Sequence, residues 1–312
     1  MSGPRAEMLA ERVALEDVEE PGPRAADSAL RRLARTLAFV TRHPLTRNDP
    51  LAALARFARW QVASRLREEI EVPWIGEARL AVRRGMTGAT GNIYCGLHEF
   101  ADMAFLLHLL RPGDLFIDVG ANVGSYTILA TKVCGASTLA FEPDPGTAQA
   151  LRRNIRINGG GGLATVHACA LGARSGEVAF TTGLDTMNRV SARPRETSRV
   201  VPLETMDSVL AGREPTLIKL DVEGYEEEVL DGARHALRSK RLLAVETELR
   251  SPRVDALLMA AGFVPAGYHP FERSLTREPA TGAANALYVR ELPVIEARVA
   301  ASPRRNVVGR LV

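Results

Sequence analysis

The chain has 312 residues, 46% of them hydrophobic, and a formal net charge of +3 from 40 basic and 37 acidic side chains. This composition is typical of a globular protein with one large core, and so small a charge does not indicate nucleic-acid binding. No apolar run approaches the roughly 20 residues of a membrane span, and Met1 to Arg24 lack the apolar core of a signal peptide. We therefore expect a cytoplasmic protein with no membrane span. The cysteines lie too far apart to indicate a disulfide framework or a zinc site.

The N-terminal third divides into a tail and a helical extension. Residues 1–27 show no hydrophobic period and many helix breakers, which predicts a disordered or loosely attached tail. Residues 28–96 are expected to form a mainly helical extension, in which Asp49 and Pro50 indicate an N-cap and a first helical position. The elements expected there are helices at 28–42 and 50–66 and a hairpin at 70–75 and 78–82.

From residue 97 onward, strand and helix patterns alternate, which is typical of a parallel sheet with right-handed crossovers. A polar, arginine-rich insertion at 183–199 is expected to shape a substrate pocket. Residues 293–312 are assigned to a C-terminal tail. The expected strands are 115–119, 137–142, 164–168, 217–221, 242–247, 263–268 and 286–291, with helices near 99–110, 123–134, 145–157, 225–237 and 252–261.

The most informative stretch is a buried strand, a glycine turn, a helix and a second strand that ends in a carboxylate. Leu115–Val119 is an apolar run of the kind that is covered on both faces of a parallel sheet. Gly120 turns the chain, and Gly124 lets the following helix pack close to its strand. Glu142 follows Asp118 by 24 positions (142 − 118), where a carboxylate can hold both hydroxyls of a ribose. This order predicts a nucleotide-cofactor site.

The glycine pattern favours S-adenosylmethionine over a dinucleotide. Asn122 stands where a dinucleotide motif requires its second glycine, which brings the backbone close to a pyrophosphate. S-adenosylmethionine has no pyrophosphate. Asp118 would accept a hydrogen bond from the ammonium group of this cofactor. The N–H groups at the helix start would bind its carboxylate, and Glu142 would bind its ribose hydroxyls. A glycine loop that only makes a tight turn is the alternative, and the spacing of Glu142 favours the cofactor. No side chain is predicted to contact adenine.

Three motifs, at 116–127, 141–143 and 218–226, carry a resemblance to a known family. They read Phe-Ile-Asp-Val-Gly-Ala-Asn-Val-Gly-Ser-Tyr-Thr, Phe-Glu-Pro and Ile-Lys-Leu-Asp-Val-Glu-Gly-Tyr-Glu, and the chain resembles the FkbM-type S-adenosylmethionine-dependent methyltransferases. The resemblance implies a class I methyltransferase (Rossmann-like) α/β fold over residues 97–292, with a seven-stranded, mostly parallel sheet and helices on both faces. It also implies methylation of a hydroxyl on a sugar or secondary metabolite. The predicted cofactor-binding residues are Asp118, Gly120, Asn122, Gly124, Thr127 and Glu142.

The ends of the strands supply the candidate catalytic residues, because strand ends of an open α/β sheet converge on one crevice. Asp221 is the first candidate for a general base or an acceptor-orienting group. Glu223 is the second, with capping of the following helix as an equal alternative. Lys219 could steer either carboxylate, although a structural role outside the site is favoured for it. His98, Glu99 and His269 are secondary candidates at the mouth of the crevice.

A second mechanism uses a metal ion. Asp221 together with Glu246 or Glu248 could hold Mg²⁺, which would lower the pKa of a diol or phenol acceptor. The alternative is that Glu246 faces water or pairs with Arg250. The favoured function is therefore O-methylation of a small molecule or glycan by in-line displacement. The alternatives are Mg²⁺-assisted O-methylation and a non-catalytic S-adenosylmethionine-binding module. A nucleic-acid methyltransferase is disfavoured, because Asp-Val-Glu-Gly follows the fourth strand in place of a base-clamping loop.

Overall fold

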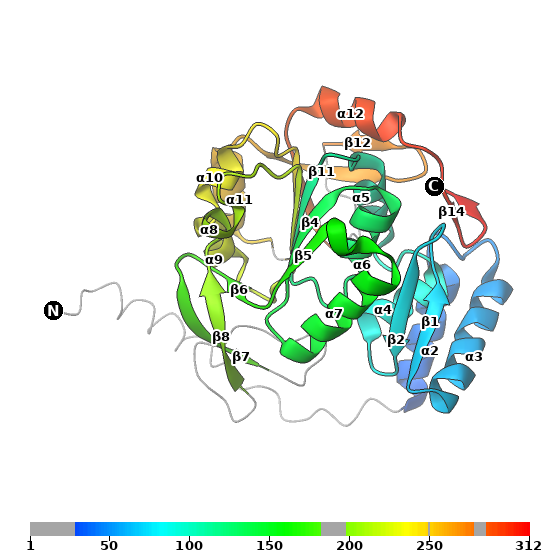
Figure 1. Ribbon diagram of the computed structural model, residues 1–312. Coiled ribbons are helices and arrows are strands. Elements are labelled where there is room, and N and C mark those ends of the chain that lie inside the picture. The colour runs from blue at the N-terminus through cyan, green and yellow to red at the C-terminus, as the bar shows by residue number, and fades with distance from the viewer. Residues whose placement is uncertain (1–28, 182–197, 249, 278–284) are drawn as a thin grey trace.

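The computed structural model describes residues 29–181, 198–248, 250–277 and 285–312 (Figure 1). Its centre is an eight-stranded sheet with the order β12-β11-β13-β10-β9-β3-β4-β5. The strands from β10 to β5 are parallel, whereas β13, β11 and β12 each pair antiparallel with their neighbours. Seven of the strands were predicted, and β12 is an additional edge strand. Their bounds are β3 Leu115–Val119, β4 Ser137–Phe141, β5 Ala164–His167, β9 Leu217–Leu220, β10 Ala244–Thr247, β11 Val264–His269, β12 Ser274–Thr276 and β13 Ala286–Val289.

Helices cover both faces of this sheet, as expected of the class I methyltransferase fold. Because side chains alternate along a strand, Phe116 packs into one core with Phe105, while Ile117 packs into the other with Leu230. The first core lies under α5 (Phe100–Leu109), α6 (Ser125–Ile128), its π-helical continuation η1 (Leu129–Val133) and α12 (Leu292–Ala300). The second lies under α8 (Met206–Leu210), α9 (Glu226–Asp231), α10 (Arg234–Arg238) and α11 (Pro252–Ala260).

The N-terminal extension packs beside α7 (Pro145–Ile157), where Figure 1 shows its hairpin. Asn154 on α7 and Asn158 at its C-cap accept hydrogen bonds from backbone N–H groups of the hairpin: Asn154 Oδ1 from Ala81 at 2.7 Å, and Asn158 Oδ1 from Arg79 at 2.8 Å. Asn154 Nδ2 also donates to the carbonyl of Val123, at 2.8 Å, in the turn after β3. The extension is thereby fastened to the predicted cofactor turn. Its elements are α2 Ala29–Arg42, α3 Pro50–Leu66, β1 Glu69–Pro73, β2 Arg79–Arg83 and α4 Thr87–Cys95.

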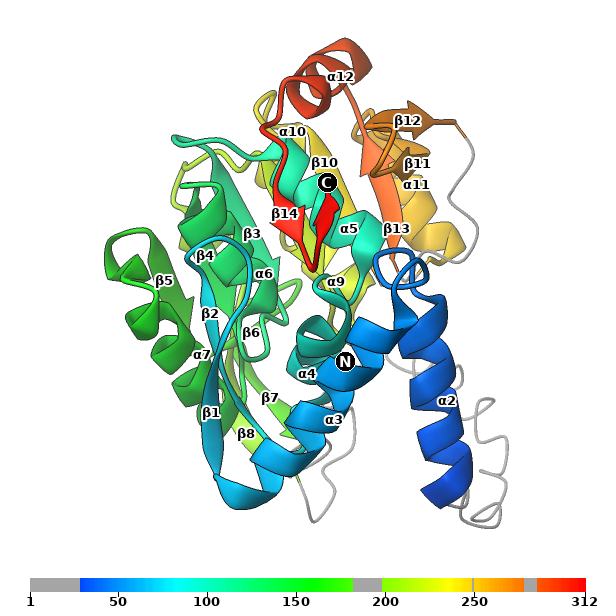
Figure 2. The same ribbon diagram turned by 90° about the vertical axis from the view of Figure 1, so that its right-hand side faces the viewer.

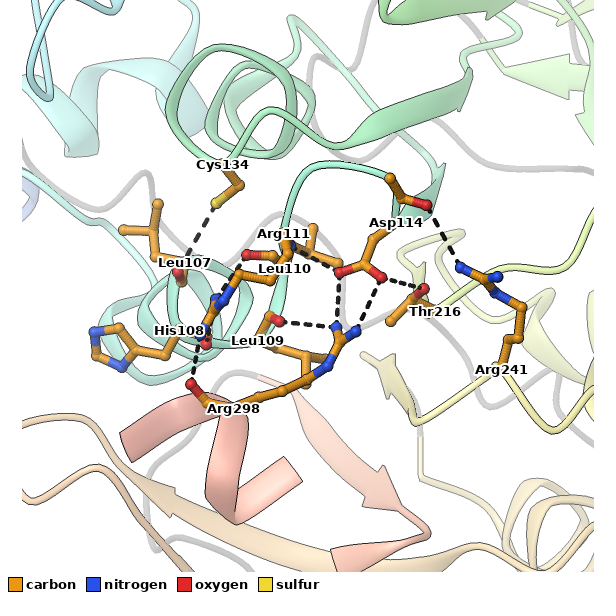
Figure 3. A network of polar contacts seen from close by, with 11 residues as sticks. Leu107, His108, Leu109, Leu110, Arg111, Asp114, Cys134, Thr216, Arg241 and Arg298 are labelled. Atoms are coloured by element: carbon orange, nitrogen blue, oxygen red, sulfur yellow. Dashed lines mark hydrogen bonds and ion pairs between the residues drawn. The ribbon is translucent and has the colours of Figure 1, made fainter. Parts of the chain in front are cut away.

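The C-terminal segment 293–312 is folded, which corrects its assignment to a tail. It contains most of α12 and the hairpin of β14 (Asn306–Val307) and β15 (Arg310–Leu311), beside α5 in Figure 2. Ile295 and Val299 lie one helical turn apart and are fully buried in the first core. Arg298 donates to both oxygens of Asp114, at 2.7 and 3.2 Å (Figure 3). This ion pair ties α12 to the start of β3.

A small sheet of β6 (Ala170–Leu171), β8 (Ser198–Glu204) and β7 (Gly176–Thr181) adjoins the main one. The predicted insertion 183–199 falls between β7 and β8 and, apart from its last two residues, lies outside the described residues. The expected tail 1–27 lies wholly outside them. None of the helices in the described ranges combines the length and apolar character that a bilayer crossing demands.

Candidate active site

A cavity of about 360 Å³ opens where β3, β4 and β9 end. In an open α/β sheet, ligands bind at this edge, beyond the carboxyl ends of the parallel strands. The structure brings most of the predicted cofactor and catalytic residues together here. Those that line the cavity are Asp118, Gly120, Asn122, Glu142, Asp221 and Glu223. Gly124 and Thr127 lie behind the lining.

The turn after β3 requires its glycines. Gly120 has φ +80°, and a Cβ there would lie 1.9 Å from the carbonyl oxygen of Asp221. Gly120 therefore permits the end of β3 to approach the end of β9. Gly124 has φ +95°, and a Cβ would lie 2.4 Å from Leu151 Cδ1 on α7. Gly124 therefore leaves room for α7, whereas the sequence predicted close packing of the following helix on its own strand.

Glu142 is held at the cavity wall by two backbone amides. Its Oε2 accepts from Asn122 N at 3.0 Å, and its Oε1 accepts from Asp144 N at 2.9 Å. Each oxygen retains a second lone pair for a ligand hydroxyl. Burial raises the pKa of Glu142 to about 7. A carboxylate fixed in this way is suited to two neighbouring hydroxyls.

Asp118 is almost fully buried at the end of β3. Its Oδ2 accepts from Thr127 Oγ1 at 2.6 Å. Burial raises the pKa of Asp118 to about 6, although the nearby Lys219 ammonium opposes this shift. Because Thr127 is itself buried and does not line the cavity, its hydroxyl orients Asp118 and has no direct path to a ligand.

One wall of the cavity is apolar and was largely missed by the sequence analysis. Phe180, at the end of β7, and Tyr225, before α9, face the same space. Phe180 also packs with Ala170 in a small core of its own. The period-two pattern of β7 was the available signal for Phe180. The remaining apolar lining includes Phe141, Cys169, Ala170 and Leu171.

Asp221 follows β9 directly, and its side chain is 33% exposed. Its Oδ2 lies 2.5 Å from Nζ of Lys219, which is 2% exposed. Nζ also lies 4.6 Å from the centre of the Tyr126 ring. Lys219 lines the cavity, so the structure does not bear out the favoured interpretation that it lies outside the site.

Two further carboxylates lie next to Asp221. Carboxylate oxygens of Asp221, Glu223 and Glu248 all lie within 4.8 Å of one another. Burial, followed by the charges of Asp221 and Glu223, raises the pKa of Glu248 to about 7. The N-cap of α9 is Tyr225, so Glu223 does not occupy the N-cap position of this helix.

Glu246 does not lie beside Asp221, where the predicted metal site would require it. It lies opposite Lys219 in the β9–β10 register, is 0% exposed, and does not line the cavity. Burial raises its pKa well above the usual range. Arg250 pairs with Asp255 rather than with Glu246. The residue that lies beside Asp221 is instead Glu248, which directly follows β10.

The cavity carries a surplus of negative charge. Among the lining residues that the structure describes, Lys219 is the one lysine or arginine, and His98 is the one histidine. Buried carboxylates without counter-charges are costly, so this lining suits a ligand that brings positive charge. The lining acids are Glu99, Asp118, Glu142, Asp221, Glu223 and Glu248.

The fold is that of a class I methyltransferase. Residues 118–265 match the methyltransferase FkbM domain, in agreement with the resemblance that the motifs indicated. A hexuronic acid methyltransferase, AglP, from Haloferax volcanii is 32% identical over 145 residues, which cover 45% of this chain and 59% of that protein. The 31-O-demethyl-FK506 methyltransferase FkbM of Streptomyces tacrolimicus is 30% identical over 178 residues, 44% of this chain and 66% of that protein.

The chain thus spans less than two thirds of the length of either relative. Among solved structures, a methyltransferase FkbM from Methylobacillus flagellatus KT aligns with 77% of this chain and 60% of its own, at 16% identity and a TM-score of 0.39. A likeness this distant adds nothing about the chemistry.

Proposed function

We propose that this protein transfers a methyl group from S-adenosylmethionine to a hydroxyl of a sugar, glycan or secondary metabolite. The observation that carries the proposal is the meeting of Glu142 and Asp221 in one cavity. Glu142 is fixed by two backbone amides, and Asp221 is fixed by Lys219. A ribose-binding group and a candidate base are therefore both preorganised.

The residues present fit this cofactor. Glu142 would hold the ribose hydroxyls, and Asp118 would accept from the ammonium group of the methionine part. The acidic lining matches the two positive charges of the cofactor, on sulfur and on nitrogen. Residues 169–171 border the cavity, and their backbone would receive the adenine without a dedicated side chain.

The chemistry required of the protein is positioning and proton removal. S-adenosylmethionine, when bound, supplies an activated methyl group. The chain's task is to hold an acceptor hydroxyl in line with that group and to take up its proton. Asp221 would accept this proton on Oδ1, because Oδ2 is engaged by Lys219. Glu223 is the neighbouring candidate for orienting the acceptor.

The names of the relatives support a hydroxyl-bearing acceptor. One is named for a hexuronic acid and the other for 31-O-demethyl-FK506. These acceptors belong to those proteins, and the acceptor of this chain is a matter for experiment.

A magnesium-assisted form of the reaction is the second candidate. It is favoured by the approach of Asp221, Glu223 and Glu248 within 4.8 Å, since Mg²⁺ prefers oxygen ligands. There Mg²⁺ would lower the pKa of the acceptor hydroxyl. Chelation of metal ions distinguishes the two mechanisms. It abolishes the magnesium-assisted reaction and leaves the metal-free reaction unchanged.

The test incubates the protein with isotopically labelled S-adenosylmethionine and with small-molecule and glycan extracts, with and without EDTA. We expect mass spectrometry to find a labelled product that is heavier by one methylene group per transfer. The Asp221→Asn variant is the negative control. A wild-type protein that binds S-adenosylhomocysteine but labels nothing would contradict the proposal and favour a non-catalytic module.

A further inference from the structure

Lys219 lies in the middle of a row of three buried ionisable side chains that crosses the sheet. Its Cα is in register with that of Asp118 on β3 and with that of Glu246 on β10. The lysine side chain is 2% exposed. An ammonium group so far removed from water costs free energy unless anionic groups surround it. The row supplies part of that compensation.

The ammonium group of Lys219 also reaches the cavity. Nζ lies 2.5 Å from Asp221 Oδ2 and 4.6 Å from the centre of the Tyr126 ring. The Tyr126 hydroxyl in turn donates to Glu99 Oε2, so the ring is fixed from its far end. The ring and the carboxylate together define one position for the ammonium group, and its contact with Asp221 is the link between the buried row and the cavity.

We propose that Lys219 is the positioning residue for Asp221. Its ammonium group holds Oδ2, so that Oδ1 is presented to the acceptor hydroxyl. This inference rests on the proposed function, in which Asp221 takes the acceptor's proton. During that step the acceptor O–H bond breaks and a bond from Asp221 Oδ1 to hydrogen forms, while the contact of Oδ2 with Lys219 persists.

Lys219 acts as a fixed charge and not as a second base. Burial alone would lower its pKa, but the charges of Asp221, Glu99 and Asp118 outweigh burial and raise it above the ordinary value. The ammonium group therefore keeps its proton throughout the reaction. It also offsets negative charge that Asp118 and Asp221 would otherwise share in one cavity.

The contact can be measured without knowing the acceptor, because the chain has just three lysines, Lys132, Lys219 and Lys240. Protein labelled with [¹³Cε]lysine gives one NMR signal for each, and Lys132→Met and Lys240→Met identify the Lys219 signal by elimination. We expect Asp221→Asn to shift the Lys219 signal at neutral pH, because the carboxylate in contact with its ammonium group is lost. The matched control is Glu77→Gln, which removes the carboxylate partner of Lys132 and should shift the Lys132 signal alone. A Lys219 signal unchanged in Asp221→Asn would overturn the proposal.

The positioning role is tested by a double-mutant cycle with the acceptor found in the labelling screen. We expect Lys219→Met to lower kcat at least about tenfold, while S-adenosylhomocysteine affinity stays within about threefold. Lys219→Met combined with Asp221→Asn should match Asp221→Asn alone, because Lys219 acts through Asp221. Lys132→Met is the control for loss of a lysine.

The two proposals fail in different ways. If the double variant shows the product of the kcat losses of Lys219→Met and Asp221→Asn, the positioning role is overturned while the proposed base stands. If Asp221→Asn keeps the wild-type kcat, Asp221 is not the base, and both the mechanism and the positioning role are wrong. Thermal melts establish whether Lys219→Met is folded. If it is not, the NMR comparison of the wild type with Asp221→Asn decides.

Discussion

The backbone N–H of Asn122 donates to Oε2 of Glu142 across 3.0 Å, which joins the glycine turn after β3 to the end of β4. The two parts of the predicted cofactor site are thus one hydrogen-bonded unit. Asn122 has φ +48°, a left-handed conformation that asparagine tolerates better than most residues. This conformation aims its N–H at the carboxylate.

Replacing Glu142 with alanine should abolish the grip on the ribose. We expect Glu142→Ala to weaken S-adenosylhomocysteine binding at least about 30-fold, because two charge-assisted hydrogen bonds are lost. Isothermal titration calorimetry measures the affinity. Glu77→Ala is the control, since Glu77 is largely exposed and pairs with Lys132 on the surface. Equal affinities for both variants would show that Glu142 does not contact the ligand.

The buried carboxyl of Glu142 should make stability depend on pH. Its pKa rises from 4.5 to about 7 in the folded protein, so between these values the folded state binds more protons than the unfolded state. The free energy of unfolding therefore falls as pH rises from about 5 to about 8. Glu142→Gln should remove a part of this fall, on the order of 1–3 kcal/mol.

Urea unfolding of the ligand-free wild type and of Glu142→Gln, at pH 5.5 and at pH 8, gives the comparison. The variant should gain stability relative to the wild type at the higher pH. An identical pH dependence in both proteins would mean that Glu142 is not the group that titrates.

Asp221→Asn should separate binding from chemistry. The amide cannot take the acceptor's proton, so we expect kcat to fall about 100-fold or more. Affinity for S-adenosylhomocysteine should stay within about threefold, because the ribose is held by Glu142. Steady-state kinetics and calorimetry on the same preparation give both numbers. If affinity falls as far as kcat does, Asp221 belongs to the cofactor site.

Gly120→Ala should push apart the ends of β3 and β9, which meet in the middle of the site. The new Cβ would lie 1.9 Å from the Asp221 carbonyl oxygen at a positive φ, so we expect a loss of about 3 kcal/mol in the free energy of unfolding. Gly161→Ala is the matched control, with no atom within 4 Å of its Cβ, and should change stability by less than about 1 kcal/mol. Chemical denaturation distinguishes the two, and a Gly120→Ala variant as stable as the control would refute the close approach of β3 to β9.

Arg298→Met should loosen the C-terminal helix. Arg298 donates to both oxygens of the buried Asp114 (Figure 3), and its loss leaves that carboxylate with Arg111 N and Thr216 Oγ1 as donors. We expect destabilisation by about 2 kcal/mol, less than for a fully buried pair because the arginine is partly exposed. Arg304→Met, at an exposed position nearby, should have little effect. A thermal melt reports both, and equal melting temperatures would mean that the ion pair does not stabilise α12.

The strands and the cofactor turn were predictable because their signals are local. Leu115–Val119 is a continuous apolar run, and the glycines and Glu142 follow at fixed offsets from it. Helix α4 was missed, since Thr87, Gly88 and Gly91 are poor helix formers that tertiary contacts override. Segment 293–312 carried a usable signal in the four-residue spacing of two apolar side chains, but a single turn of periodicity does not distinguish a packed helix from a tail.

The two residues that the sequence analysis misplaced, Glu246 and Lys219, differ from their predicted positions in whether their side chains reach the cavity. Glu246 lies on β10 and Glu248 directly follows this strand, and sequence alone does not show which of them reaches the cavity. Register decides this, because it sets Glu246 opposite the buried Lys219. Lys219 lies on β9 and Asp221 directly follows this strand, two positions on, and this spacing does not show that the lysine side chain reaches the cavity. Side-chain reach across strands is a tertiary property, so neither position could be read from spacing along the chain.

A crystal structure of the protein with S-adenosylhomocysteine tests the central claim most directly. We expect the ribose hydroxyls within hydrogen-bonding distance of Glu142, with the amino-acid end of the compound beside Asp118 and its sulfur facing Asp221. The compound bound elsewhere on the molecule, or bound in this cavity with its ribose away from Glu142, would contradict the account.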